Sequence, residues 1–209
     1  MGEQLHQRGI DHYSDRRWQD QNYQRGFFEQ RGDFPSMNLI VTCARHLEPE
    51  TEEELRGFLD ELGDSEPKVT ITSMSGILTA ETNLEPVEVV RKIKEMLLDE
   101  PWSVRYCLRI IPIQRVVETK IEEIEKVVDE LSDNISKDEK YRISIEKRNS
   151  DMSSQEIIKK IASKIKSQVS LEFPDKVVLI EILGNKTGIS VLKKSDILST
   201  EKTKRSMSE

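Results

Sequence analysis

Apolar positions in residues 37–117 predict four strands and two helices. Leucine, isoleucine, valine and phenylalanine recur at helical spacing over 51–62 and over 85–98. Short apolar or alternating runs, typical of strands, occur at 38–44, 68–74, 77–82 and 104–113. The resulting order, strand, helix, strand, strand, helix, strand, predicts a ferredoxin-like βαββαβ domain.

Local signals predict where these two helices begin and end. Thr51 and Glu54 have the spacing of a capping box, which predicts that the first helix starts at Thr51. Gly63 predicts its end, because glycine readily adopts the left-handed conformation that follows many helices. Pro86 suits the first turn of the second helix, where a missing N–H removes no hydrogen bond.

The pattern in residues 118–196 predicts a different order: helix, strand, helix, strand, strand. Helices are expected over 120–135 and after Ser153, which forms a second capping box with Glu156, and strands over 140–148, 175–183 and 186–193. Alternation in the first of these strands places Tyr141, Ile143 and Ile145 on its buried side. The uninterrupted apolar run of the second strand predicts a central, doubly covered position.

The two ends of the chain lack both patterns, and we expect disordered tails at 1–36 and 197–209. The first tail contains the triplet QRG three times, among scattered aromatic residues. Two interpretations stay open for it: stacking of Arg and aromatic side chains on RNA bases, or a solvated tail. The predicted fold class is therefore α+β, with a ferredoxin-like domain at 37–117 and an αβαββ domain at 118–196.

Charge is distributed unevenly between these segments. The net charge is -1 over residues 1–36, -12 over 37–139 and +6 over 140–209, which together give the -7 of the whole chain. A basic last third in an acidic chain suggests contact with nucleic acid. No apolar run approaches the about 18 residues that a membrane-spanning helix needs, and the polar N-terminus has no signal-peptide centre. We therefore expect a cytoplasmic protein without membrane contact.

Basic residues gather around the predicted strand ends and on the helix after Ser153. As RNA contacts we select Lys147, Arg148, Lys159, Lys160, Lys164, Lys186, Lys193, Arg109 and Arg115. Strands of one sheet and a helix on its face could bring these side chains into one groove, where they would neutralise phosphates without reading sequence. The alternative is a set of separate solvated charges.

Motifs that carry catalysis are missing from the sequence. It contains no phosphate-binding loop, no dinucleotide-binding glycine pattern and no nucleophile elbow. The three histidines, His6, His12 and His46, cannot assemble a triad or a zinc site at their positions. Cys43 and Cys107 each lie in an apolar run and are interpreted as small buried residues rather than as reactive thiols. We expect no enzyme activity, no cofactor, no metal and no small-molecule substrate.

Two stretches of the sequence resemble a known family. The segments YRISIEKRNSDMSSQEIIKKIASKI and FPDKVVLIEILGNKTGISVL are similar to the core of a THUMP domain, an RNA-binding module of tRNA-modifying proteins. The preceding SGILTAET, EPVEVVRKI and RYCLRIIPI resemble the ferredoxin-like domain that often precedes it. Phe173 stands before Pro174 where other THUMP proteins often have Asn, a departure from the pattern.

The absence of a catalytic module makes the chain similar to the stand-alone THUMP adaptor required for N4-acetylcytidine formation in tRNA, whose RIIP is matched at 109–112. The resemblance implies binding of the acceptor end and 3′ terminus of tRNA, with a separate tRNA cytidine acetyltransferase as partner. Alternatives are an RNA-binding subunit for tRNA thiolation or methylation, a protein-interaction scaffold, and a small transferase that uses Cys43 or Cys107.

Overall fold

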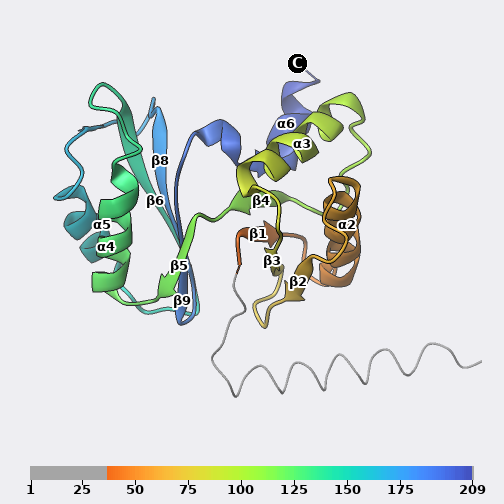
Figure 1. Cartoon of the computed structure of the whole chain (residues 1–209), viewed down its shortest axis with the longest axis horizontal. Coiled ribbons are helices and arrows are strands. Elements are labelled where there is room, and N and C mark those ends of the chain that lie inside the picture. Colours follow the sequence, from red (N-terminus) through yellow and green to blue (C-terminus); the bar gives the residue numbers. More distant parts are fainter. Residues whose placement is uncertain (1–36, 209) are drawn as a thin grey trace, which may run out of the picture. The chain divides into compact units, whose positions relative to one another are not determined.

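The computed structural model describes residues 37–208. Their strands form two five-stranded sheets, and helices pack on these sheets (Figure 1). The tail expected at 1–36 lies outside the described residues. The first sheet has the strand order β10-β4-β1-β3-β2, and the second has the order β5-β9-β8-β6-β7. The prediction of a mixed α+β chain is confirmed.

The first sheet is built mainly by residues 39–112. Its consecutive elements are β1 (Leu39–Thr42), α2 (Glu48–Glu61), β2 (Lys68–Ile71), β3 (Ile77–Glu81), α3 (Pro86–Asp99) and β4 (Arg109–Pro112). β1 pairs antiparallel with β3 and β4, and β2 pairs with β3. Leu55 of α2 and Ile93 of α3 pack with Leu39, Leu78 and Ile110 of the strands in one core. The predicted ferredoxin-like βαββαβ order is confirmed.

Helix α2 begins three residues earlier than the sequence predicted. Proline in its first turn allows the start at Glu48, and the Thr51 hydroxyl donates to the carbonyl oxygen of Leu47 at 2.6 Å. The capping box predicted at Thr51 and Glu54 is therefore wrong. Gly63, with φ of 108°, follows the last turn as predicted.

The second sheet arises from residues 115–192. Its consecutive elements are β5 (Arg115–Glu118), α4 (Ile121–Ser132), β6 (Lys140–Arg148), α5 (Ser154–Ala162), β7 (Gln168–Val169), β8 (Lys176–Leu183) and β9 (Lys186–Leu192). β6 pairs parallel with β8 and β7, and β9 pairs antiparallel with β8 and β5. Helices α4 and α5 cover one face, where Ile124 and Ile157 pack on Val178 and Ile180. The predicted αβαββ order is confirmed, with the edge strands β5 and β7 in addition.

The expected disordered tail at 197–209 is wrong for the described residues 197–208. After the short 3-10 helix η1 (Lys194–Asp196), β10 (Leu198–Ser199) pairs with β4 of the first sheet, and α6 (Thr200–Ser206) follows. Leu198 is fully buried, and the Thr200 hydroxyl donates to the Cys107 carbonyl oxygen at 2.6 Å. This polar segment is ordered by backbone pairing and by one buried leucine, neither of which its own periodicity reveals.

The faces of the two sheets that carry no helix pack against each other. Ile40, Ile77 and Ile111 of the first sheet share a core with Leu179 and Leu183 of β8. β9 also holds the connection between β4 and β5, because the Ser190 hydroxyl donates to the Pro112 carbonyl oxygen at 2.8 Å. A β-carbon at Gly188 would lie 3.0 Å from the Ile113 side chain, so a larger residue here would push that side chain out of its place. The two sheets therefore share one buried interface.

Candidate nucleic-acid interface

Three of the predicted basic residues lie at one end of the second sheet. Arg148, at the end of β6, is in register with Leu183 of β8, and Leu183 is in register with Lys186 of β9. Lys147 is exposed, and its Nζ donates to the Met152 carbonyl oxygen at 2.8 Å, which holds it against the loop before α5. Lys147, Arg148 and Lys186 are thus brought to one edge by strand register.

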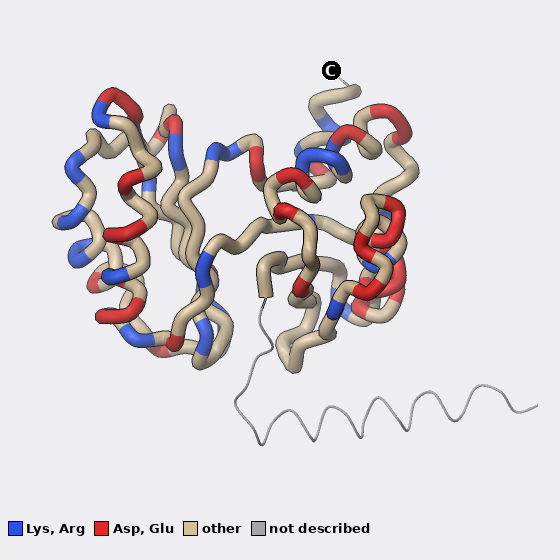
Figure 2. Tube along the Cα trace, in the orientation of Figure 1, with Lys and Arg blue, Asp and Glu red and all other residues tan. Residues whose placement is uncertain are grey.

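Helix α5 carries two further candidates away from its buried side. Ser153 caps the helix by accepting from the Glu156 N–H at 3.4 Å, as its spacing predicted. Ile157 is buried in the core against α4, whereas Lys159 is exposed and Lys160 half-buried in the last turn. Figure 2 shows Lys and Arg together with Asp and Glu on the helix-bearing side of this sheet, and a concentration of Asp and Glu on α2.

Lys164, Arg115 and Lys193 occupy separate surroundings. Lys164 forms an ion pair of 3.4 Å with Glu125 of α4. Arg115 is exposed on the edge strand β5 and donates to the carbonyl oxygen of its neighbour Gln114 at 2.9 Å. Lys193 follows the far end of β9, about 24 Å from Lys186 at about 3.4 Å per residue. The nine predicted residues therefore do not converge on a single groove.

The remaining candidate, Arg109, belongs together with Arg148 to a chain of ion pairs between the sheets. Arg109 of β4 donates to Glu146 of β6 at 2.7 Å, and Arg148 donates to the same carboxylate at 3.2 Å. Arg148 also donates to Glu181 of β8 at 3.2 Å. Glu181 is fully buried, and its Oε1 has no hydrogen-bond partner among the described residues. These four side chains, the inter-sheet cluster, join the first sheet to the second.

Burial raises the pKa of Glu181 to about 7, and the nearby negative charge of Glu146 adds to this effect. Arg148 and Arg109 act in the opposite direction without cancelling it. Glu146 is also partly buried, but its bonds to Arg109 and Arg148 lower its pKa below the ordinary value. Glu146 therefore keeps its charge near neutral pH, while Glu181 titrates there.

The cluster changes the interpretation of Arg109 and Arg148. Both guanidinium groups are already bound to carboxylates, and about 30% of each side chain is exposed: 31% for Arg109 and 28% for Arg148. Their first effect is to hold the two sheets together. Phosphate contact by either residue stays a prediction, as it does for the lysines.

Glu146 and Glu181 are the partners that sequence reasoning missed. Alternation placed Glu146 and Arg148 on the same side of a strand, but a sequence alone does not indicate that another sheet covers that side. Glu181 had a stronger signal, since it interrupts an apolar strand of eight residues. A buried carboxylate in such a strand needs a cationic partner. Arg148 provides it from β6, which is the neighbour of β8 in the sheet although it lies far from it in the sequence.

The cysteines and acidic residues show no reactive arrangement. Cys43 and Cys107 are both free and buried, as interpreted from the sequence. Burial raises the pKa of each thiol, for Cys107 well above its ordinary value, so both stay protonated near neutral pH. Within residues 37–208 no group of three or more His, Cys, Asp or Glu side chains is placed to hold a metal ion. Within the same residues no helix has both the length and the apolarity to cross a membrane.

Comparison with protein families identifies the second sheet and its helices. Residues 118–192 match the family model of the THUMP domain. This segment is a THUMP domain. The match runs from Glu118, the last residue of β5, to Leu192, the last residue of β9, and the resemblance noted in the sequence is confirmed at the level of the domain. The domain bounds 37–117 and 118–196 stay predictions.

Three similar proteins extend the comparison. MJ0421, an uncharacterised protein of Methanocaldococcus jannaschii, is 31% identical over 126 residues, covering 58% of this chain and 35% of its own. PH1313 from Pyrococcus horikoshii has a TM-score of 0.60 at 20% identity, over 76% of this chain and 55% of its own. TrmN from Thermus thermophilus has a TM-score of 0.53 at 14% identity, over 75% of this chain and 45% of its own.

A 4-thiouridine synthetase, solved in complex with RNA and ATP, has a TM-score of 0.50 at 13% identity, over 78% of this chain and 42% of its own. At these identities the solved structures establish a shared fold. The chain spans about a third of the length of MJ0421 and about half the length of the solved chains.

Proposed function

We propose that the protein is a non-catalytic tRNA-binding adaptor that acts in the cytoplasm. It would present the acceptor end and 3′ terminus of tRNA to a separate acetyltransferase for N4-acetylcytidine formation. The observation that carries the proposal is a THUMP domain at 118–192 with lysines at one sheet end and on α5, of which Lys147 and Lys159 are exposed and Lys160 and Lys186 half-buried. The similar fold of a 4-thiouridine synthetase that was solved with RNA supports the binding part.

The arrangement of the lysines suits recognition by shape. A-form RNA hides its base edges in a deep major groove, so a protein that serves several tRNAs must rely on phosphates and unpaired ends. Lys147 and Lys186 lie at the end of a rigid sheet, and Lys159 and Lys160 lie on the helix that packs on it. Such ammonium groups neutralise phosphates without selecting sequence.

The shared interface between the sheets supports the adaptor role. An adaptor can hold a tRNA and a protein partner at a fixed distance only if its two domains cannot move apart. The hydrophobic core around Ile111 and Leu179 and the inter-sheet cluster supply that constraint. The choice of acetylation rests on the resemblance at Arg109–Pro112, and the acetyltransferase partner rests on the same resemblance.

Gel-shift titration tests the binding. Intact tRNA should bind more tightly than tRNA that lacks its single-stranded 3′ end, and equal or absent binding to both would refute the acceptor-end proposal. The double variant Lys147→Ala/Lys186→Ala should weaken binding to intact tRNA. Lys68→Ala is the control, since Lys68 is an exposed lysine on β2 of the other domain.

Mass spectrometry of tRNA nucleosides tests the role. Cells without the gene should lose N4-acetylcytidine and regain it when the gene is restored. Selective loss of a thiolated or a methylated nucleoside would instead support one of the alternative modifications. Turnover of tRNA by this chain alone would contradict the non-catalytic role.

A further inference from the structure

A pocket on the ferredoxin-like domain lies outside the lysine surfaces described above. Its lining combines carboxylates of α2 with the loop between α3 and β4: Glu50, Glu53, Glu54, Trp102, Ser103 and Tyr106. Arg105 also borders it, so three carboxylates face one guanidinium. The pocket therefore has a negative balance and an aromatic wall.

The loop that forms this wall is held in place by one side chain. Glu54 accepts the backbone N–H groups of Arg105 at 2.6 Å, Tyr106 at 3.0 Å and Cys107 at 2.8 Å. Arg105 Nε donates to the Trp102 carbonyl oxygen at 3.3 Å. Because these bonds fix the backbone around Trp102, the pocket is present before any ligand arrives.

Within residues 37–208, two side chains of the pocket, Trp102 and Ser103, lack the packing or hydrogen-bond partners that such groups usually have. The Trp102 side chain is attached to this fixed loop, yet the residue is 64% exposed. The Ser103 hydroxyl oxygen is buried and has no hydrogen-bond partner among the described residues. An exposed tryptophan beside an unpaired hydroxyl is costly for a plain surface and is typical of a binding surface.

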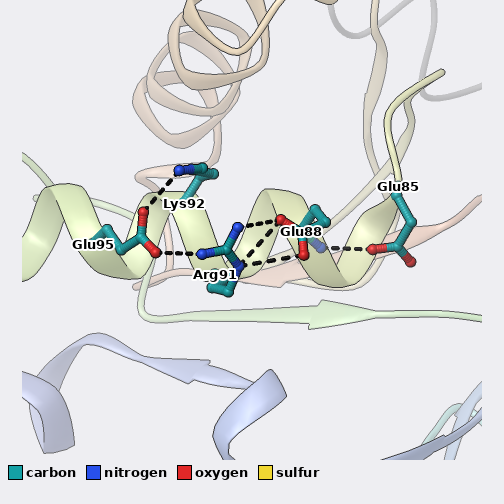
Figure 3. A network of polar contacts seen from close by, with 5 residues as sticks. All are labelled: Glu85, Glu88, Arg91, Lys92 and Glu95. Carbon is teal, nitrogen blue, oxygen red and sulfur yellow. Dashed lines mark hydrogen bonds and ion pairs between the residues drawn. The ribbon is translucent and has the colours of Figure 1, made fainter.

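The carboxylates of the pocket differ from those of α3. On α3, Arg91 bonds to both Glu88 and Glu95, and Lys92 bonds to Glu95 at 3.0 Å (Figure 3). On α2, Glu50 and Glu53 are exposed and have no ion pair or hydrogen bond within residues 37–208. These two lie one helical turn apart on the same side of α2, so they are available to one cation.

We propose that this pocket binds a lysine or arginine side chain from a basic segment of a protein partner. Glu50 and Glu53 would pair with the cation, and Trp102 would stack on it. A nucleic acid does not fit here, because its phosphates would face the carboxylates. The partner thus binds a domain whose charge is opposite to that of the tRNA-binding lysines, which leaves those lysines free.

A peptide titration with the full chain tests the proposal. The probe is an acetylated, amidated octapeptide of alternating Lys and Gly, and the signal is the fluorescence of Trp102 in a Trp18→Phe background, which leaves one tryptophan. Glu50→Gln/Glu53→Gln should weaken binding about fivefold, since each exposed pair is worth up to about 1 kcal/mol. Trp102→Ala, followed by calorimetry, should weaken it about twofold to fivefold.

The matched control is Asp60→Asn/Glu61→Gln. It removes two exposed charges from the same helix, near its far end and outside the pocket lining. This control should change the affinity less than twofold. Equal weakening by both double variants, or no peptide binding at 50 mM salt, would overturn the proposal. Retained tRNA binding by Glu50→Gln/Glu53→Gln would show that the two surfaces are independent, whereas its loss would also overturn it.

Discussion

The two domains shift the pKa of a buried carboxylate in opposite directions. In the ferredoxin-like domain, burial alone would raise the pKa of Asp64, but hydrogen bonds from the Thr82 hydroxyl at 2.5 Å and the Asn83 N–H at 3.1 Å lower it below the ordinary value. In the THUMP domain, Glu181 meets a second carboxylate and one bound arginine, and its pKa rises to about 7. A buried carboxylate is stabilised as an anion by backbone and hydroxyl donors and destabilised by an incomplete set of partners.

Glu48 follows the same rule as Asp64. Burial works against its charge, but the Gly76 N–H donates to its Oε1 at 2.7 Å and its pKa is lowered. Both residues tie a helix or its following loop to a turn of the first sheet. The inter-sheet cluster instead joins residues that come from different domains, and its geometry must satisfy both. The difference suggests that the first domain is locally self-sufficient, while the junction depends on charge state.

The largest effect is expected at Asp64. Asp64→Ala should lower the free energy of unfolding by about 3 kcal/mol at pH 7, since it leaves the Thr82 hydroxyl and the Asn83 N–H without their acceptor. Asp64→Asn keeps an acceptor and should cost less. Because the folded pKa of Asp64 is lowered, its stabilisation is present above the unfolded pKa of about 3.9 and is lost as the pH falls through the folded value. Urea unfolding followed by circular dichroism measures the stability of the two variants and its dependence on pH. A loss below about 1 kcal/mol for the alanine variant would contradict the comparison.

The next effect concerns Glu181 and has the opposite dependence on pH. Its folded pKa of about 7 lies above the unfolded value, so the folded state keeps the proton and is favoured at low pH. This stability is lost as the pH rises through about 7. Relative to Glu181→Gln, the wild type should lose about 2 kcal/mol between pH 5 and pH 8, at about 1.4 kcal/mol per pKa unit. Thermal unfolding across that range tests this, and parallel curves for the two proteins would refute it.

Arg148→Met tests the same cluster from its cationic side. At pH 8 the variant should lose between about 1 and 2 kcal/mol, because Glu181 keeps a buried charge without its partner. The partial exposure of Arg148 and the ability of Glu181 to take up a proton keep the cost below that of a fully buried pair. At pH 6 the loss should shrink. Arg142→Met is the control, since Arg142 is half-buried on the same side of β6 and outside the cluster.

The smallest expected effect is a difference between lysine and arginine variants in the salt dependence of tRNA binding. Lys147→Ala and Lys186→Ala should each reduce the slope of log K against log salt by about one without changing stability. Arg148→Met should change stability, and we expect it to lower the slope less than the lysine variants do, because its guanidinium is already bound to Glu146 and Glu181. Titrations of tRNA at several potassium chloride concentrations provide the slopes. A loss of slope for Arg148→Met as large as that for Lys147→Ala would show that Arg148 contacts phosphate.

Periodicity predicted the elements best where one face of an element is buried within its own domain. The alternation of Tyr141, Ile143 and Ile145 gave β6 at its observed bounds, and the Ser153 cap gave the start of α5. The same reasoning failed for β5 and β10, which are short and are ordered by pairing with strands distant in sequence. It also failed at Glu54, whose partners are backbone groups about 50 residues away.

The positions of some basic residues followed from the spacing within one element, whereas those of others depended on packing between elements. That Lys159 and Lys160 lie outside the core followed from helical spacing, because Ile157 and Ile161 must face the sheet. The positions of Lys186 and Lys193 at opposite ends of β9 also follow from a single strand. The pairing of Arg109 and Arg148 through Glu146 did not follow, because it requires the second sheet to pack on the first.

By itself, the sequence determined the order of the elements, the buried face of each helix and the division into an acidic and a basic segment, since these depend on local spacing and composition. It was also sufficient to indicate a THUMP domain. The tertiary structure alone decided that the C-terminal segment completes the first sheet, that two arginines bind glutamates between the sheets, and that an aromatic, acidic pocket forms beside α2. The physical reason is that strand pairing, burial of a charge and the closing of a pocket all depend on residues that are brought together only by folding.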